Sequence, residues 1–145
     1  MNSDIKIRKV NQADATKWFK FVNKVWRSAY INIFPEEVFL EKEKNVEEKE
    51  KNFNKKIFND NRNIALVAEY KGKIIGIMCG SINSKYEHFN VKYADLIGLY
   101  IDPDFQGKGI GSSFKRMFEE WAIKNGATKY VIGVLKDNHK ARTIY

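Results

Sequence analysis

Apolar and polar residues alternate at the start of the chain and then recur at helical spacing. The alternation over residues 5–10 predicts a short strand, and the spacing of three or four over residues 14–28 predicts an amphipathic helix with Asp14 as its N-cap. After Pro35, a stretch rich in lysine and glutamate carries only sparse apolar residues. It predicts one further helix or two, mostly exposed to solvent.

The middle of the chain carries β-rich segments in place of helical spacing. Residues 64–70 and 73–83 are separated by Lys71-Gly72, which predicts a hairpin, and residues 93–101 predict another strand. Gly98 within that strand indicates a bulge or a close approach of the backbone.

Helical spacing returns over residues 111–125, where Gly126 is placed to end the helix. Residues 128–135 predict one more strand, and Asn138 could cap a final helix. The order is therefore β-α-α-β-β-β-α-β-α. It predicts a single α/β (α+β) domain over residues 1–145, with an open mixed sheet flanked by helices.

Composition limits the kind of protein this is. Hydrophobic residues make up 43% of 145 positions and only two residues are proline, as in a packed single domain. The single cysteine, Cys79, excludes an internal disulfide and a cysteine-built zinc site. No signal peptide, membrane span or metal is expected, so a cytoplasmic protein is predicted.

The net charge of +8 raises the possibility of a polyanionic partner. Residues 41–62 are nearly balanced, with seven basic and six acidic groups, whereas residues 105–145 hold eight basic and three acidic groups. The excess of positive charge therefore lies around a glycine-rich segment. A nucleic-acid-binding module is the weaker interpretation, because no nucleic-acid-binding motif is present and no nucleic acid is expected as a partner.

The glycine-rich segment, Gln106 to Ser112, lies between a predicted strand and a predicted helix. Such a loop directs several backbone N–H groups toward an anion at the positive end of the helix dipole. Its three glycines permit positive φ and close backbone approach. The spacing fits neither the nucleotide P-loop nor the dinucleotide-binding fingerprint. The segment predicts a phosphate site of another kind.

The segment Gln106-Gly107-Lys108-Gly109-Ile110-Gly111 resembles the Q/R-x-x-G-x-G/A signature of the GNAT N-acetyltransferase superfamily, and Asn138-x-x-Ala141 with Tyr145 resembles a later motif of that family. The resemblance covers the whole chain. It implies a mostly antiparallel central sheet, with acetyl-CoA as cosubstrate and a primary amine of a small molecule or peptide as acceptor. The cofactor-binding residues that it implies are Leu99, Tyr100, Ile101, Gln106, Gly107, Lys108, Gly109, Ile110, Gly111, Ser112 and Asn138.

The resemblance also implies catalytic roles. An amine must lose a proton before it attacks, and Asp95 is the candidate base, with a water path as the alternative. Tyr145 lies where the family carries its general acid, which would reprotonate the leaving thiolate. The acceptor site is expected to involve Trp26, Tyr30, Phe34, Tyr86 and His88.

In the family, the helix opened by Asn138 continues into a β-hairpin that this sequence lacks, so a C-terminally truncated domain is expected, with a possible homodimer covering the exposed edge. An acyl-CoA-binding domain without turnover is then a second interpretation. A coenzyme A release assay over a panel of amines would separate the two.

Overall fold

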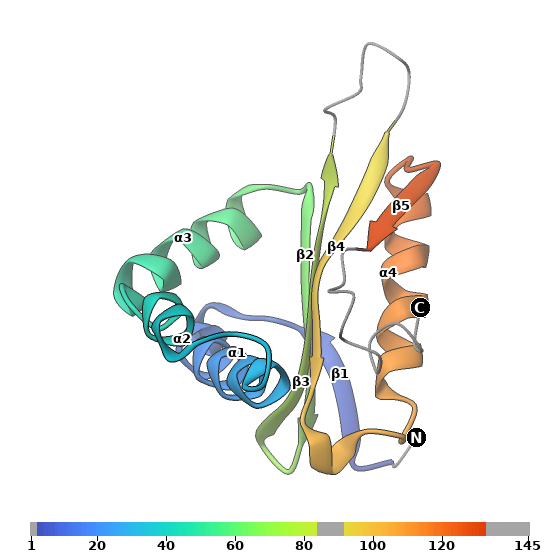
Figure 1. Cartoon of the computed structure of the whole chain (residues 1–145). Helices are drawn as coiled ribbons and strands as arrows, with labels where there is room; N and C mark the ends of the chain where they lie inside the picture. The colour runs from blue at the N-terminus through green and yellow to red at the C-terminus, as the bar shows by residue number, and fades with distance from the viewer. Residues whose placement is uncertain (1–2, 84–91, 133–145) are drawn as a thin grey trace.

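The protein forms one five-stranded sheet with helices on both faces (Figure 1). The computed structural model describes residues 3–83 and 92–132. Neighbouring strands follow chain order, the first three pairs are antiparallel, and the last pair is parallel. The strands are β1 (Ile5–Lys9), β2 (Asn63–Tyr70), β3 (Lys73–Asn83), β4 (Tyr93–Ile101) and β5 (Lys129–Ile132). The predicted fold class, a mixed and mostly antiparallel sheet flanked by helices, is confirmed.

Among the described residues, three α-helices cover one face of the sheet and a fourth covers the other (Figure 1). They are α1 (Ala15–Tyr30), α2 (Glu36–Lys42), α3 (Val46–Asn59) and α4 (Ile110–Lys124). The lysine-rich stretch forms two helices because Asn45 adopts a left-handed conformation between them (φ 57°), which asparagine tolerates better than most residues. The final helix predicted after Asn138 lies outside the described residues.

The two turns that the sequence predicts both use a left-handed glycine. Lys71 and Gly72 have φ of 49° and 80°, which matches the primed turns that suit a two-residue hairpin. Gly126 has φ 84° and ends α4, where the N–H groups of Gly126 and Ala127 donate to the carbonyls of Ile123 and Ala122 at 3.0 and 2.9 Å. This is the Schellman arrangement.

Strand β4 contains a bulge. Cys79 of β3 lies opposite Gly98, but the next residue, Gly80, lies opposite Leu96, so Ile97 is an extra residue in β4. Ala94 and Leu96 face the core under α4 before the bulge, and Leu99 and Ile101 face it after the bulge. The bulge predicted near Gly98 is confirmed.

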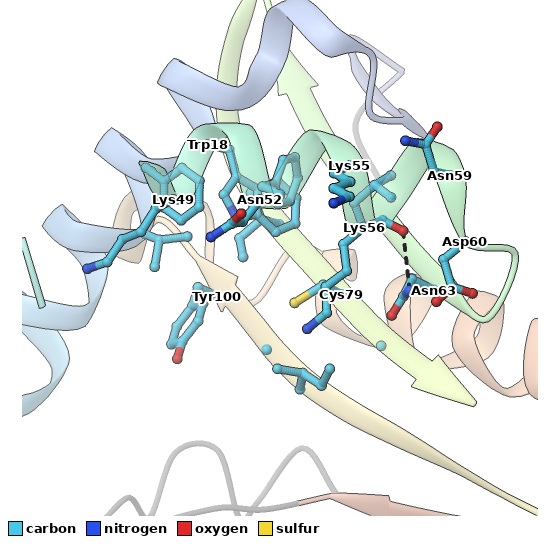
Figure 2. Close-up of a pocket in the computed structure, with 18 of the residues that line it drawn as sticks. Trp18, Lys49, Asn52, Lys55, Lys56, Asn59, Asp60, Asn63, Cys79 and Tyr100 are labelled. Atoms are coloured by element: carbon cyan, nitrogen blue, oxygen red, sulfur yellow. Dashed lines mark hydrogen bonds between the residues drawn. The ribbon is translucent and has the colours of Figure 1, made fainter. Parts of the chain in front are cut away.

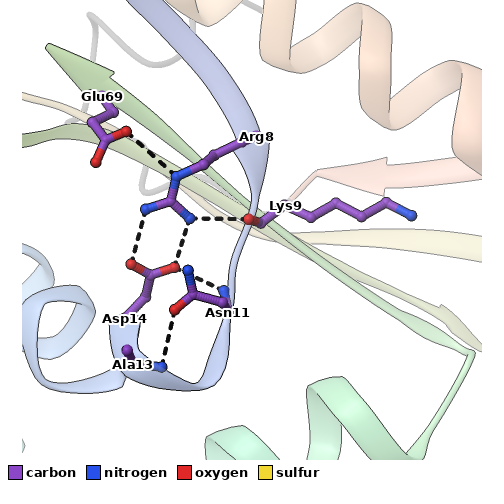
Figure 3. Close-up of polar contacts among 6 residues, drawn as sticks. All are labelled: Arg8, Lys9, Asn11, Ala13, Asp14 and Glu69. Carbon is purple, nitrogen blue, oxygen red and sulfur yellow. Dashed lines mark hydrogen bonds and ion pairs between the residues drawn. The ribbon is translucent and has the colours of Figure 1, made fainter. Parts of the chain in front are cut away.

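Asp14 does not cap α1, contrary to the sequence prediction. It lies at the residue before the helix, but its carboxylate turns back and accepts the N–H of Asn11 at 2.7 Å. The same carboxylate accepts two hydrogen bonds from Arg8, at 2.7 and 3.0 Å, and Arg8 also contacts Glu69 on β2 at 3.4 Å (Figure 3). Arg8 is a tertiary partner that local sequence rules do not include. The network joins β1, β2 and the start of α1.

Two glycines of β3 let α4 approach the sheet. A Cβ at Gly80 would lie 2.8 Å from the backbone oxygen of Asp95 and 2.8 Å from the ring of Phe118, whereas at Gly76 the nearest atom, on the ring of Phe114, would be 3.2 Å away. Backbone moves less readily than a ring. The space at Gly80 is therefore the less adaptable of the two.

We expect Gly80→Ala to destabilise the protein by about 1 to 3 kcal/mol, because the added methyl group overpacks the contact between β3, β4 and α4. Gly76→Ala is the matched comparison and should cost less. Urea unfolding of both variants measures the difference. Equal stability of Gly80→Ala and the unmodified chain would contradict the packing described here.

We expect Asp14→Asn to destabilise the protein by about 1 to 3 kcal/mol at neutral pH, since a charged hydrogen-bond partner of Arg8 is removed. Arg8 holds the pKa of Asp14 below its ordinary value of 3.8. The stabilisation is therefore complete well above that pH and is lost as pH falls toward the lowered pKa.

The gap in melting temperature between the unmodified chain and Asp14→Asn should thus narrow below about pH 4. Glu48→Gln, at an exposed carboxylate on α3, serves as the control and should show no comparable gap. A gap that stays constant from neutral pH to pH 3 would exclude this role of the Arg8 pair.

Candidate functional site

The glycine loop begins at a rigid turn at the end of β4. The N–H of Asp102 donates to the carbonyl of Ile75 at 2.8 Å, and its buried carboxylate accepts the N–H of Asp104 at 2.9 Å. Phe105 then packs its ring against Tyr70, with centroids 5.2 Å apart. These contacts fix the direction in which the chain enters the loop.

The loop itself leads into an uncapped helix. Gly107 and Gly109 have φ of 77° and 88°, and α4 begins at Ile110. No side chain of the described residues caps this end, and Ser113 is the first residue whose N–H bonds back into the loop, to Gly109 at 3.1 Å. The first backbone N–H groups of α4 therefore point out of the helix, at the positive end of its dipole.

The space around this end fits an anion. A Cβ at Gly107 or Gly109 would meet no atom within 4 Å, and Lys108 between them is exposed. Ile110 and Gly111 are buried under the helix start, while Ser112 is exposed. The predicted phosphate-binding segment thus forms an open cradle of N–H groups with a mobile cation beside it.

Gln106 anchors the cradle to the strand. Its side-chain amide donates to the carbonyl of Ile101 at 3.3 Å. Leu99 and Ile101 direct their side chains into the core under α4, and Tyr100 directs its ring to the opposite face. In β4, the residues paired with β5 are Tyr93 to Leu96, and Leu96 lies opposite Ile132, the last residue of β5. The part of the predicted strand 128–135 that follows residue 132 lies outside the described residues.

A cavity of about 890 Å³ lies on the other face of the sheet, between α1, α3 and the bulge of β4 (Figure 2). Trp18 and Phe53 contribute apolar walls from the two helices, and Ile97 and Gly98 line the cavity at the bulge. Ile97 is 60% exposed. The bulge thus brings β4 backbone to the edge of a space large enough for a small molecule.

Cys79 of β3 forms part of the cavity wall. Burial raises the pKa of its thiol to about 11, although the ammonium groups of Lys56 and Lys42 oppose the shift. The thiol is therefore neutral at physiological pH.

Asp95, the predicted base, lies two residues before Ile97. Its neighbours Ala94 and Leu96 face α4, so its side chain stands on the opposite face of β4, as Ile97 does. Its carboxylate accepts a hydrogen bond from the side-chain amide of Asn83 at 2.9 Å. Asp95 is half-buried beside the cavity, not in its wall.

The aromatic residues predicted at the acceptor site gather at the junction of α1 and α2. Trp26 stacks on Phe34 with centroids 5.3 Å apart, and Tyr30 packs at 5.1 Å from Trp26. Arg27 pairs with Glu36 and Glu43 and does not point to the cavity wall. Lys42 connects this aromatic cluster with the cavity, because it lines the cavity and its ammonium lies 5.0 Å from the Trp26 ring.

Several predicted residues lie outside the described part of the chain, namely Tyr86, His88, Asn138 and Tyr145. Within residues 3–83 and 92–132, no group of three or more His, Cys, Asp or Glu side chains could hold a metal ion. The helices in those same residues are too short or too polar to cross a membrane.

Sequence reasoning missed four cavity residues, Lys42, Lys49, Lys55 and Lys56. They belong to the charge-balanced stretch after Pro35, where lysines and glutamates alternate closely. For Lys49 and Lys56 the available signal is helical spacing, which puts them on one face of α3 with Phe53 and Ile57. Lys42 belongs to α2, so this spacing does not include it.

Comparison with known proteins adds the family. The model of the acetyltransferase (GNAT) family matches residues 20–145. A curated relative, acetyl transferase GW6a of Oryza sativa subsp. japonica, is 29% identical over 93 residues, which is 57% of this chain and 22% of the relative. The chain thus spans about a fifth of the length of the curated relatives it matches.

Two solved structures show the same fold. The PaiA N-acetyltransferase of Thermoplasma acidophilum in complex with coenzyme A has a TM-score of 0.80 at 21% identity, covering 100% of this chain and 87% of that one. The aminoglycoside acetyltransferase meta-AAC0020, from an uncultured soil metagenomic sample and in complex with sisomicin, has a TM-score of 0.70 at 18% identity, covering 97% and 84%. Because the family model matches most of its length, the chain belongs to the acetyltransferase (GNAT) family.

Proposed function

We propose that the protein transfers an acetyl group from acetyl-CoA to a primary amine by direct attack. The observation that carries the proposal is that an uncapped helix N-terminus follows β4, and an open cavity meets the same strand at its bulge. A cosubstrate held at the helix N-terminus and an acceptor held in the cavity would meet at β4. Family membership and the coenzyme A complex of a structural neighbour support the same reading.

Acetyl-CoA would be held mainly by backbone groups. The N–H groups of residues 107–112 would bind the pyrophosphate, with Lys108 as a mobile counter-charge. The pantetheine arm would add to the sheet along β4 through the backbone of Leu99, Tyr100 and Ile101, and Asn138 would bond to it further along. An arm on that path places the thioester near the bulge.

The chemistry at the bulge requires two proton transfers. The amine nitrogen forms a bond to the thioester carbon, and the carbon–sulfur bond breaks once the tetrahedral intermediate collapses. A backbone N–H of β4 beside the bulge, that of Leu99 or Tyr100, would stabilise the oxyanion. Asp95, directly or through a water, would take the proton that the amine releases, and Tyr145 would donate a proton to the departing thiolate.

The acceptor class proposed here is a primary amine. Aminoglycoside complexes among the structural neighbours make amines the first compounds to test. The cavity volume of about 890 Å³ lies within the range of sites for small molecules, about 300 to 1,000 Å³, and favours a small acceptor.

We expect Gly109→Val to weaken coenzyme A binding by tenfold or more, which calorimetry measures. A β-branched residue at φ 88° costs about 1 to 2 kcal/mol, and relaxing that strain would turn the N–H groups of the loop away from the pyrophosphate. Gly72→Val is the matched control. Its φ of 80° imposes the same strain in the β2–β3 hairpin, and its Cβ would also meet nothing within 4 Å.

Gly72→Val should therefore lose stability while it keeps its affinity for coenzyme A. Affinity of Gly109→Val equal to that of the unmodified chain would reject the loop as the phosphate site. Coenzyme A binding without acetyl transfer to any amine of a broad panel would favour the alternative, an acyl-CoA-binding domain.

We expect Asp95→Asn to lower kcat by about 10² to 10⁴-fold with little change in the affinity for coenzyme A. The amide can still bond to Asn83, so the fold should be kept. The deficit should shrink as pH rises toward the pKa of the amine, ~10, because the amine then reaches the site already deprotonated. Unchanged turnover at neutral pH would assign the proton transfer to a water path instead.

A further inference from the structure

The cavity beside the bulge carries a cation cluster, which we define as Lys42, Lys49, Lys55 and Lys56. All four line the cavity, and Asp60 is its only acidic lining residue among those described. The carboxylate of Asp60 is already bound by the guanidinium of Arg62, at 3.1 and 3.0 Å, and by its backbone N–H at 3.0 Å. The cavity therefore presents positive charge with no free carboxylate in the described wall.

The lysines of this cluster have no carboxylate partner in the part of the chain that the structure describes. Within residues 3–83 and 92–132, no carboxylate oxygen lies within 4.0 Å of any of the four ammonium groups, whereas Lys44 and Lys115 each have one. Lys49 instead donates to the backbone carbonyl of Lys42. Solvated surface lysines are ordinary, but here four line one concave space.

The cavity wall takes lysines, and not glutamates, from the described residues of α3. Its three glutamates, Glu47, Glu48 and Glu50, are absent from the described cavity wall, while three of its four lysines line it. Within the described wall, α3 therefore contributes positive charge alone.

The lysines come from two helices, Lys42 from α2 and the other three from α3. Figure 2 shows Lys56 extending from α3 toward Cys79, and both Lys56 and Lys42 act on the charge state of that thiol. Burial and the charge of Lys49 together lower the pKa of Lys42. Like charges held close in a partly buried space repel one another, and a bound anion relieves that repulsion.

The cluster is separate from the predicted coenzyme A phosphate site. The cluster lies on the face of the sheet covered by α1 and α3, whereas α4 and its N-terminus lie across the sheet (Figure 1). Ile97 and Gly98 connect the cavity to the bulge, where the proposed acetyl transfer takes place. An anion on the lysines would thus belong to the acceptor.

We propose that the acceptor is a small primary amine that also carries an anionic group, a carboxylate or a phosphate, bound by the cation cluster. This rests on the proposed function of the same site. The amine lies at the bulge, the carbon body lies against Trp18 and Phe53, and the anion reaches the lysines. Acceptors with several positive charges are repelled by the same groups.

The test uses amines that share one six-carbon chain: 6-aminohexanoate, 6-aminohexyl phosphate, hexylamine and 1,6-diaminohexane. Binding to the protein saturated with coenzyme A is measured by calorimetry, and acetyl transfer by coenzyme A release. We expect at least one anionic amine to bind about tenfold or more tightly than hexylamine, and the diamine to bind most weakly. The two anionic amines distinguish a carboxylate site from a phosphate site.

The double variant Lys49→Gln/Lys56→Gln should abolish that preference, and 0.5 M salt should weaken it in the unmodified chain, by about tenfold in each case. Lys51→Gln, at the α3 lysine outside the cavity wall, is the control and should keep it. Coenzyme A affinity should be the same in all variants, which separates the cluster from the phosphate site.

The calorimetric measurement does not need turnover. Binding of anionic amines without acetylation would therefore count against the proposed function and still support an anion site at the cation cluster. The inference would be overturned if the diamine bound as tightly as the anionic amines or more tightly. It would also be overturned if neither anionic amine bound. A preference that survives in Lys49→Gln/Lys56→Gln, shown to be folded by circular dichroism, would overturn it too.

Discussion

The extra residue at Ile97 is the constraint on which the candidate site depends. Side chains of a strand alternate between its two faces, and one inserted residue reverses that alternation. The core under α4 therefore receives side chains from both sides of the bulge, namely Ala94 and Leu96 before it and Leu99 after it. The reversal leaves Ile97 and Gly98 together at the cavity. Without it, either the core under α4 or the cavity would lose its lining.

The bulge is tolerated because small residues surround it. Gly80 lies opposite the end of the regular pairing and gives room to the backbone of Asp95 and the ring of Phe118. Gly98 lies against Cys79 and Tyr100, where a side chain would meet the sulfur at 3.4 Å and the ring at 3.3 Å. The absence of a side chain at Gly80 also lets α4 lie close to the sheet. The packing under α4 thus influences the position of the bulge, which lines the cavity on the other face.

Local chemistry explains what could be predicted from the sequence. The hairpin at Lys71-Gly72, the bulge near Gly98 and the end of α4 at Gly126 each depend on residues a few positions apart, and all three agree with the structure. Asp14 was assigned wrongly because its partner Arg8 belongs to another element. A capping rule that considers only the following helix cannot include such a partner.

The cavity lysines show the same limit at the scale of the fold. Counting charges along residues 41–62 gives near balance, and only the packing of α3 against α1 decides which charges face inward. The loop at Gly107 and Gly109, with an uncapped helix start after a strand, could be predicted because its strand, loop and helix are contiguous in the chain. A site assembled from α1, α2, α3, β3 and β4 has no such contiguous signature.

Cys79 gives the cavity wall a chemical property of its own. A thiol with a pKa of about 11 is ionised in only about one molecule in ten thousand at pH 7. A thiolate in that position would exchange acyl groups with any thioester brought to the bulge and would trap the group as a dead-end adduct. In the proposed reaction, the neutral thiol would leave a deprotonated amine as the better nucleophile. Cys79 could then line the cavity beside a thioester without reacting with it.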